Sequence, residues 1–400
     1  MQHHLIVLKI LKIGVYILTN KLKNISVENR KSLYSLYYQW WKNIDKFLFF
    51  LIILLFIIGL FFSLVSTSLI VSDKLNTNDY TFFFKHLSFV FLGIIIIFVI
   101  SSINEEKLFK ISPIIFLFSL ISLILVPIIG VEVNSAQRWI DLYLLPRFQP
   151  IELVKPFLII LISLILSSEK YKNIYLKYLS SFLITLIIAL LLAAQPDIGQ
   201  TLLVFFSWSV LIFISGINLF FLITSCSILS IVLYYSVRFV PKFEYTKNRI
   251  LSFFNTETGT HNAQSEKAID SITSGGYFGK GIGEGTLKNR VPEAHTDYII
   301  SVISEEFGVI AIMLIILLFL IFIYSVFKKV YLENEERIRL ILVGCISLIL
   351  VQAMIHIGVN IRLFPTTGMT LPFISYGGSS IISISILSGI ILNLTKRRIN

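Results

Sequence analysis

The sequence is poor in charge and in cysteine. Charged residues make up 14% of the chain, and its two cysteines are Cys226 and Cys345. Soluble globular domains carry about 25% charged residues, so the low charge excludes an ordinary soluble fold. Both cysteines lie inside apolar runs, which argues against a disulfide framework and a zinc site. No cleavable signal peptide is evident at the start, and no internal repeat supports an inverted-repeat transporter.

What fills the chain instead is apolar sequence. Hydrophobic residues make up 56% of it, including 34 Phe and 17 Tyr, and the mean hydropathy is +0.85. This composition indicates an integral membrane protein with aromatic anchors at the membrane interfaces. The net charge of +11 then reflects Lys and Arg in cytoplasmic segments that meet anionic lipid. Nucleic acid is not an expected partner.

The apolar runs predict the fold class. A helix needs about 20 mostly apolar residues to cross a bilayer, and this criterion predicts an all-α polytopic membrane protein with about ten transmembrane helices. The expected spans are residues 47–72, 87–103, 108–131, 151–168, 179–195, 199–216, 218–239, 298–327, 340–361 and 374–394. A large periplasmic loop, residues 240–297, connects helices 7 and 8.

Basic residues predict the orientation and the domains. They concentrate in a basic N-terminal arm, residues 1–46, in short loops on the same side, and in a basic tail, residues 395–400. The positive-inside rule makes that side cytoplasmic, with both termini there. Residues 47–394 form the expected membrane domain. The large loop breaks the rule with basic residues of its own, which calls for another explanation.

The motif-like stretches all fall on the opposite face. In the first, Asn134–Lys155, Pro150 begins a helix, and Glu152 and Lys155 can pair at i,i+3. The functional interpretation is that four side chains line a polar cleft for a phosphorylated lipid head group: Arg138, Gln149, Glu152 and Lys155. The alternative is that Arg138 and Lys155 extend to the lipid head groups.

Asp197, in the second stretch QPDIGQT, either caps the following helix or contacts a cation or substrate. The third stretch is the glycine-rich end of the large loop, whose glycine spacing does not fit nucleotide binding. A helix is expected to begin at about Pro292, with Asp297, Ser301 and Glu305 on one face. For Asp297, beside His295, the alternatives are a helix-end charge and a functional acid. Glu305 and Glu306 could instead pair with a buried cation.

The fourth stretch, Arg362–Ser380, is rich in proline and glycine within an apolar context. It predicts a broken, re-entrant backbone, which survives at membrane depth only where protein buries it or it lines a cavity. Hydroxyl side chains, among them Ser375 and Ser379, could satisfy the freed backbone groups or contact the substrate. His356 and Asn360 are expected to make interior polar contacts.

Together these stretches resemble the SEDS family of bacterial cell-shape and division proteins. The resemblance is carried by the RW…FQPxELxK stretch (Arg138 to Lys155), QPDIGQT, GGYFGKGIGEG with PEAHTDYI, and PTTGMTLPFISYGGSS (Pro365 to Ser380). It extends over nearly the whole chain from about residue 47 and is greatest to the cell-division members. Two positions depart from the pattern: Ile151 replaces a usual Ser, and Thr367 stands where division members commonly have Lys.

The resemblance implies a peptidoglycan glycosyltransferase that polymerises lipid II at the outer face of the bacterial inner membrane during cell division. Asp297 would be the catalytic base. From the charges of the outer face, the candidates for the diphosphate contacts are Arg138, Lys155, Arg249 and Lys280, with Gln149, Glu152, Asp197, His295, Ser375 and Ser379 as further candidate substrate contacts. A divalent cation, Mg²⁺ or Mn²⁺, could assist, although no metal-ligand spacing is present.

The resemblance also implies partners and leaves alternatives open. A class B penicillin-binding transpeptidase and other divisome proteins are the expected partners, and the division septum the expected place. One alternative function is that of the elongation polymerase. Another is a lipid II flippase without catalytic activity. A flippase would need polar residues along a path through the whole bilayer, whereas the polar motifs collect at one face.

Overall fold

The computed structural model describes residues 37–67, 81–133, 136–141, 146–169, 173–217, 219–254, 260–287 and 294–396. Phe47–Thr395 form one compact unit. Most of the predicted N-terminal arm and basic tail lies outside the described residues, so those domain boundaries stay a prediction.

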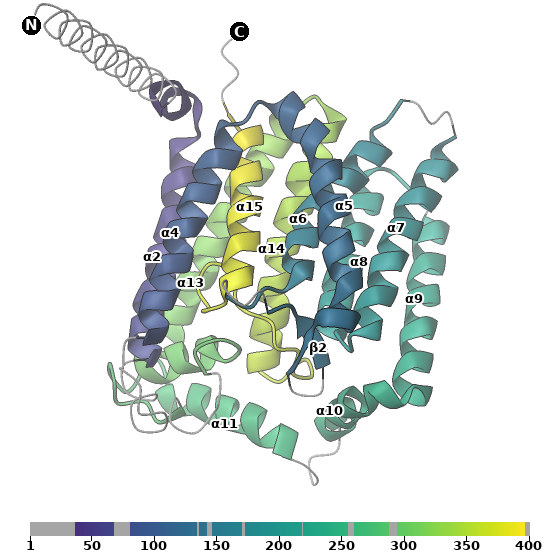
Figure 1. The fold of residues 1–400 in the computed structure, drawn as a ribbon. Coiled ribbons are helices and arrows are strands. Elements are labelled where there is room, and N and C mark those ends of the chain that lie inside the picture. The colour runs from purple at the N-terminus through teal and green to yellow at the C-terminus, as the bar shows by residue number, and fades with distance from the viewer. Residues whose placement is uncertain are drawn as a thin grey trace, which may run out of the picture. The chain divides into compact units, whose positions relative to one another are not determined.

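The unit is built almost entirely of helices (Figure 1). The helices of the apolar runs are α2 (Lys46–Thr67), α4 (Thr81–Ser102), α5 (Glu105–Ile129), α6 (Pro150–Leu166), α7 (Ile174–Ala194), α8 (Ile198–Ile214), α9 (Leu219–Phe239), α13 (Ile299–Leu332), α14 (Glu336–Asn360) and α15 (Gly378–Leu394). A short antiparallel pair, β1 (Val131–Val133) and β2 (Ala136–Trp139), follows α5.

Each expected span overlaps one of these helices. In the described part of the chain, seven helices are long and apolar enough to cross a membrane: α2, α4, α5, α7, α9, α13 and α14. The other three, α6, α8 and α15, have 17 residues each. A multi-pass membrane protein is therefore confirmed, while the count of ten spans stays a prediction.

Local sequence explains several helix starts. Asn104 accepts a hydrogen bond from the backbone N–H of Glu106 at the start of α5, and Asn173 caps α7 in the same way. Asp197 accepts from Gln200 N at the start of α8, as the capping interpretation predicts. Pro150 occupies the first turn of α6, where its missing N–H costs nothing.

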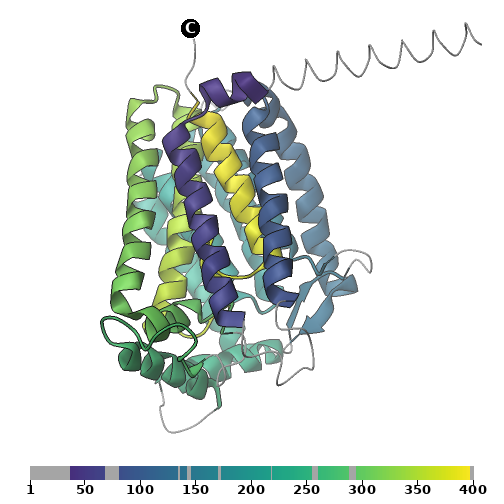
Figure 2. The ribbon, with the colours of Figure 1, turned by 90° about the vertical axis from the view of Figure 1, so that its left-hand side faces the viewer.

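The interior of the unit is formed by helices that small residues bring close together. α14 and α15 are buried over most of their lengths, and α9 is largely exposed. α4 runs alongside α15 (Figure 2). A Cβ at Gly93 would lie 2.4 Å from Ser385 Oγ, and one at Gly389 would lie 2.9 Å from Ile100 Cβ. Small residues at such contacts are typical of membrane helix packing.

The predicted large loop, residues 240–297, contains short helices of its own. It is not irregular throughout, because it contains η1 (Pro241–Phe243), α10 (Glu244–Phe254) and α11 (Thr260–Gly275). α10 and α11 lie at the same end of the helices as β2 (Figure 1). The glycines that follow α11 pack against α13 and are described with the site.

The prediction that a helix begins at about Pro292 is wrong for residues 294–298, which form turns. α13 begins at Ile299 and is broken at Gly308, whose φ of 78° and ψ of 177° are not helical. Asp297 therefore lies in the turn before the helix and does not share a helical face with Ser301 and Glu305. Residues 288–293 lie outside the described residues.

The broken, re-entrant backbone is confirmed after α14. The chain is non-helical through residues 361–377, so the last helix starts at Gly378 and not at residue 374. Phe373, at a φ of 65°, is buried, and its ring contacts Phe56 and Phe322. A Cβ at Gly59 in α2 would lie 2.3 Å from Phe373 O. Only glycine at position 59 admits this segment between the helices.

Candidate active site

A polar cavity of about 840 Å³ lies where the predicted motifs meet. Its wall is drawn from α4, from β2 and the segment before α6, from the start of α8, from α10, from the turn before α13, and from the segment before α15. Seven residues predicted for the site line it: Arg138, Gln149, Glu152, Asp197, Arg249, His295 and Asp297. Stretches up to about 230 residues apart in sequence therefore share one site, as the hydrogen bond from Gln149 N to Ser379 Oγ also shows.

The turn that carries Asp297 is fixed through three consecutive backbone carbonyls. Tyr376 N donates to His295 O at 3.3 Å, and Ser375 Oγ donates to Thr296 O at 2.7 Å. Asn360 Nδ2 donates to Asp297 O at 3.0 Å.

The Asn360 side chain acts both as a hydrogen-bond donor and as an acceptor. Its Oδ1 accepts hydrogen bonds from Ser301 N at 3.2 Å and from Ser301 Oγ at 2.8 Å. Asn360 is fully buried. It therefore joins the end of α14 to both sides of the turn before α13. A donor and an acceptor are needed at this position, and an amide supplies both.

The Asp297 carboxylate faces the segment before α15. A Cβ at Gly368 would lie 3.5 Å from Asp297 Oδ2, and Gly368 has a φ of 69°. This left-handed backbone favours glycine. The turn and the re-entrant segment thus approach each other at the cavity wall, with the carboxylate between them.

Cations line the cavity together with these carboxylates. Arg138 donates to Gln195 O at 3.4 Å and to Pro196 O, and its Nε lies 3.7 Å from Asp197 Oδ2. Gln149 Nε2 donates to the same carboxylate oxygen at 3.2 Å. Arg138 is thus held by the turn before α8 and is not extended to lipid head groups.

Two further cations were missed by the sequence analysis. Lys85 of α4 and Arg147 line the cavity beside Arg138 and Arg249. Lys85 lies in the first turns of α4, just ahead of the expected span 87–103, and Arg147 lies inside the stretch Asn134–Lys155 but was not singled out there. The described lining therefore holds four cations and three carboxylates, which gives it a net positive formal charge.

A buried polar network lies beside the cavity. Lys155 Nζ lies 2.8 Å from Glu152 Oε2, so the predicted i,i+3 pair is present, and both side chains are buried. Lys155 therefore does not reach lipid head groups. Gln200 Nε2 donates to Glu152 Oε1 at 3.0 Å, and Gln352 of α14 bonds to Lys155 and to Thr370 O. Gln352 was not singled out from the sequence. A polar residue inside an apolar span was the available signal.

Four predicted contacts lie outside the cavity lining. Lys280 is separated from the cavity because its ammonium bonds to Glu305 Oε1 at 2.9 Å, the pairing that was the alternative for Glu305. Lys155 is bonded within the network. Ser379 accepts a hydrogen bond from Gln149 N and Ser375 donates one to Thr296 O, and their assignment as substrate contacts stays a prediction.

His295 lies in a cluster of rings at the cavity wall. Its ring centroid is 5.1 Å from that of Phe82 and 5.9 Å from that of Tyr376. Burial lowers the pKa of His295 to about 4, because an apolar environment disfavours the charged imidazolium. His295 is therefore a neutral side chain next to Asp297 at physiological pH.

The predicted divalent cation finds no preformed site in the described part of the chain. No three His, Cys, Asp or Glu residues there are grouped closely enough to hold a metal ion. Two carboxylates of the cavity are engaged with other groups: Asp197 with Arg138, Gln149 and Gln200 N, and Glu152 with Lys155 and Gln200. The metal stays a prediction, and no step is assigned to it.

Fold and cavity together define a multi-pass membrane protein with a cationic polar site that also holds a carboxylate. The chain belongs to the FTSW_RODA_SPOVE family of cell cycle proteins, whose family model matches residues 45–400. The predicted SEDS membership is thereby confirmed.

Named relatives and solved structures agree with this membership. The chain is 32% identical to the probable peptidoglycan glycosyltransferase FtsW of Haemophilus influenzae, over 88% of this chain and 90% of that protein. It is 34% identical to the same-named protein of Wigglesworthia glossinidia brevipalpis, over 94% and 98%.

Among solved structures, the crystal structure of the rod shape determining protein RodA of Thermus thermophilus has a TM-score of 0.65 at 25% identity. The match covers 88% of this chain and 96% of the RodA chain. A chain from a peptidoglycan synthase complex, studied for the coordination of polymerization and crosslinking, has a TM-score of 0.73 at 25% identity, covering 88% and 97%. The prediction of an enzyme in the peptidoglycan glycosyltransferase family is confirmed by these named relatives.

Proposed function

We propose that this chain polymerises lipid II into glycan strands at the outer face of the cytoplasmic membrane, during cell division. The observation that carries the proposal is the cavity, which Asp297 lines together with cations from distant parts of the sequence. A volume of about 840 Å³ is in the range of sites for small polar ligands, and the cavity lies at one end of the apolar helices.

In the proposed reaction, Asp297 is the general base. It accepts the proton of the acceptor sugar's 4-hydroxyl as that oxygen forms a bond to the anomeric carbon of the donor sugar. The bond between that carbon and the diphosphate oxygen breaks, and the electron pair leaves with the polyprenyl diphosphate. The fixed carbonyls of residues 295–297 support the orientation of the carboxylate.

The departing diphosphate requires positive charge. Arg138, Arg249, Lys85 and Arg147 line the same cavity, and arginine can donate two parallel hydrogen bonds to a phosphate. Arg138 is already oriented by Gln195 O and Pro196 O, so it loses little freedom on binding. Removing a preorganised donor of this kind costs about 10²–10³ in turnover in enzymes where it has been measured.

The protein's partners are part of the proposal. One solved relative is a chain of a complex that coordinates polymerization with crosslinking. We therefore include a class B penicillin-binding transpeptidase as the partner of this chain, with both chain termini on the cytoplasmic side.

The test is purified protein, with its transpeptidase, given labelled lipid II in liposomes. Asp297→Asn is expected to lower polymer formation by roughly 10²- to 10⁴-fold, because an amide cannot accept the proton. Glu284→Gln makes the same chemical change at an exposed carboxylate outside the cavity lining and is expected to leave the rate unchanged. Movement of lipid II across the bilayer without polymer, insensitive to Asp297→Asn, would establish the flippase and overturn the polymerase.

A further inference from the structure

The glycine-rich segment Gly275–Gly285 exposes three apolar side chains outside any helix. Tyr277 is 76% exposed, Phe278 83% and Ile282 66%. The segment follows α11 directly and connects to Thr286 and Leu287. Water is an unfavourable environment for three apolar side chains on one short segment, so an apolar phase is expected to cover them.

The segment is not free to move away from α13. Its backbone is bonded on both sides of the break at Gly308. Lys280 N donates to Glu305 O at 2.9 Å, and Gly281 N donates to Glu306 O at 3.0 Å. Beyond the break, Val309 N donates to Gly276 O at 3.0 Å.

Glycine makes this contact possible. A Cβ at Gly279, whose φ is 80°, would lie 2.2 Å from Glu306 O. A Cβ at Gly308 would lie 2.1 Å from Tyr277 O. The height of the segment along the membrane normal is therefore set by the break in α13.

That height can be estimated from α13 itself. The uncharged run from Val309 to Phe327 ends at Lys328 and Lys329. At about 1.5 Å per residue the run is roughly 28 Å long, close to the roughly 30 Å thickness of the hydrocarbon core. If the two lysines mark one boundary of the core, the break at Gly308 marks the other.

A second helix contacts α13 at the break, near its own end. Phe307, next to the break, contacts the rings of Phe61 and Phe62 near the end of α2. α2 ends at Thr67, about five residues or roughly 8 Å further on. The glycine-rich segment therefore lies at the membrane interface, where tyrosine and other aromatic side chains are typically found.

We propose that Tyr277, Phe278 and Ile282 insert into the lipid leaflet at this interface and anchor the large loop to the bilayer. The occupant of the exposed apolar surface is the lipid itself. Nothing in this argument depends on the reaction that the cavity performs.

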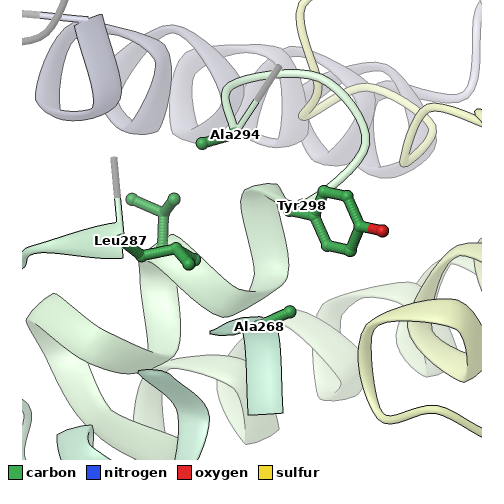
Figure 3. Packing of buried hydrophobic residues seen from close by; sticks show 5 residues of the cluster. Ala268, Leu287, Ala294 and Tyr298 are labelled. Atoms are coloured by element: carbon green, nitrogen blue, oxygen red, sulfur yellow. The ribbon is translucent and has the colours of Figure 1, made fainter. Parts of the chain in front are cut away.

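The anchor belongs to the same packed unit as the Asp297 turn. Glu305 accepts from Thr286 N at 2.9 Å and from Leu287 N at 2.8 Å, so it holds the end of the segment. Leu287 belongs to a buried cluster with Ala294 and Tyr298, which flank the Asp297 turn (Figure 3). A role of the anchor in catalysis rests on the proposed function.

Depth measurement with spin labels tests the insertion. Both native cysteines are replaced by alanine, the label is attached at Phe278→Cys in liposomes, and its accessibility to oxygen is compared with that to a water-soluble nickel chelate. Met313, exposed on α13 inside the apolar run, supplies the lipid reference, and Asp270, exposed on α11, supplies the water reference. The label at 278 is expected to behave like the one at 313, with oxygen accessibility exceeding nickel accessibility.

Two results would overturn the proposal. A label at 278 that behaves like the one at 270 would show that the segment faces water, and a label shielded from both reagents would show that protein covers it. Phe278→Trp provides a second measurement that keeps an aromatic ring, since brominated phospholipids should quench the added fluorescence relative to native protein. If native protein makes no polymer from lipid II, the proposed function fails, while the labels still decide the insertion.

Discussion

Asn360 is the residue whose loss should most selectively disturb the Asp297 turn. Asn360→Ala removes the donor to Asp297 O and the acceptor for Ser301, while the carboxylate itself remains. Because small displacements of a reacting group can cost up to about 10²-fold, we expect a tenfold to hundredfold loss of polymerisation rate. Substrate affinity should change little, because Asn360 does not line the cavity.

Two variants separate this positioning role from a loss of folding. Asn360→Asp keeps the acceptor for Ser301 and loses the donors to Asp297 O and His356 O, so it should have the rate defect although Ser301 keeps its partner. Ser347→Ala, on the same helix, removes a hydroxyl bonded only within α14 and should leave the rate unchanged. Lowered affinity with an unchanged maximal rate in Asn360→Ala would contradict the positioning role.

His295 should make the stability of the protein depend on pH in the acidic range. Its pKa is about 4 when folded and about 6.5 when exposed in the unfolded chain. Between these values the unfolded state binds more protons, so stability rises with pH from about 4 to about 6.5 and is lost as the pH falls through that window.

The measurement is the thermal unfolding midpoint in detergent between pH 4 and pH 8, for native protein and His295→Gln. Glutamine does not titrate, so its midpoint should vary less steeply below pH 6.5, while the two proteins should be parallel above it. An equal pH dependence in both proteins would show that other groups cause the acid sensitivity. The variant also loses ring contacts to Phe82 and Tyr376, which should lower the midpoint at every pH.

At the scale of elements, the positions of the helices could be predicted because long apolar runs leave few alternatives in a bilayer. The broken segment after α14 was also predictable, since proline and glycine interrupt an apolar run there. The break in α13 was not. Gly308 stands alone in an otherwise helical pattern, and its conformation depends on the segment at residues 276–281 that bonds to both sides of it.

The same reasoning explains which site residues could be predicted. Asp297 and Asp197 stand at the ends of apolar runs and Arg138 stands in the loop between two of them, and the topology places these segments together at the cavity. The pairing of Lys280 could not be predicted, because a lone cation in a loop carries no sign of its partner, here Glu305, 25 residues later. The missed Gln352 is one polar residue in an apolar span, and its role appears only once α6, α14 and the segment before α15 are in contact.

At the scale of the whole molecule, the fold alone does not separate division from elongation, because RodA has the same architecture. The departure from the division pattern at Thr367 lies in the cavity lining. A Cβ at Gly199 would lie 3.1 Å from Thr367 Cβ, so the side chain is packed against the start of α8. A threonine in place of lysine at this position removes one positive charge from the cavity lining. The fold does not depend on that change.

The division assignment is therefore best tested in the cell. The curated relatives above are named FtsW, and on that basis a fluorescent fusion of this chain should collect at the septum and stay there in the Asp297→Asn form. Depletion should produce filaments, because side-wall synthesis continues while the septum is not built. A signal spread along the side wall, with rounded cells on depletion, would instead assign the chain to elongation. Loss of both patterns in the Asp297→Asn form would mean that localisation itself requires polymerisation.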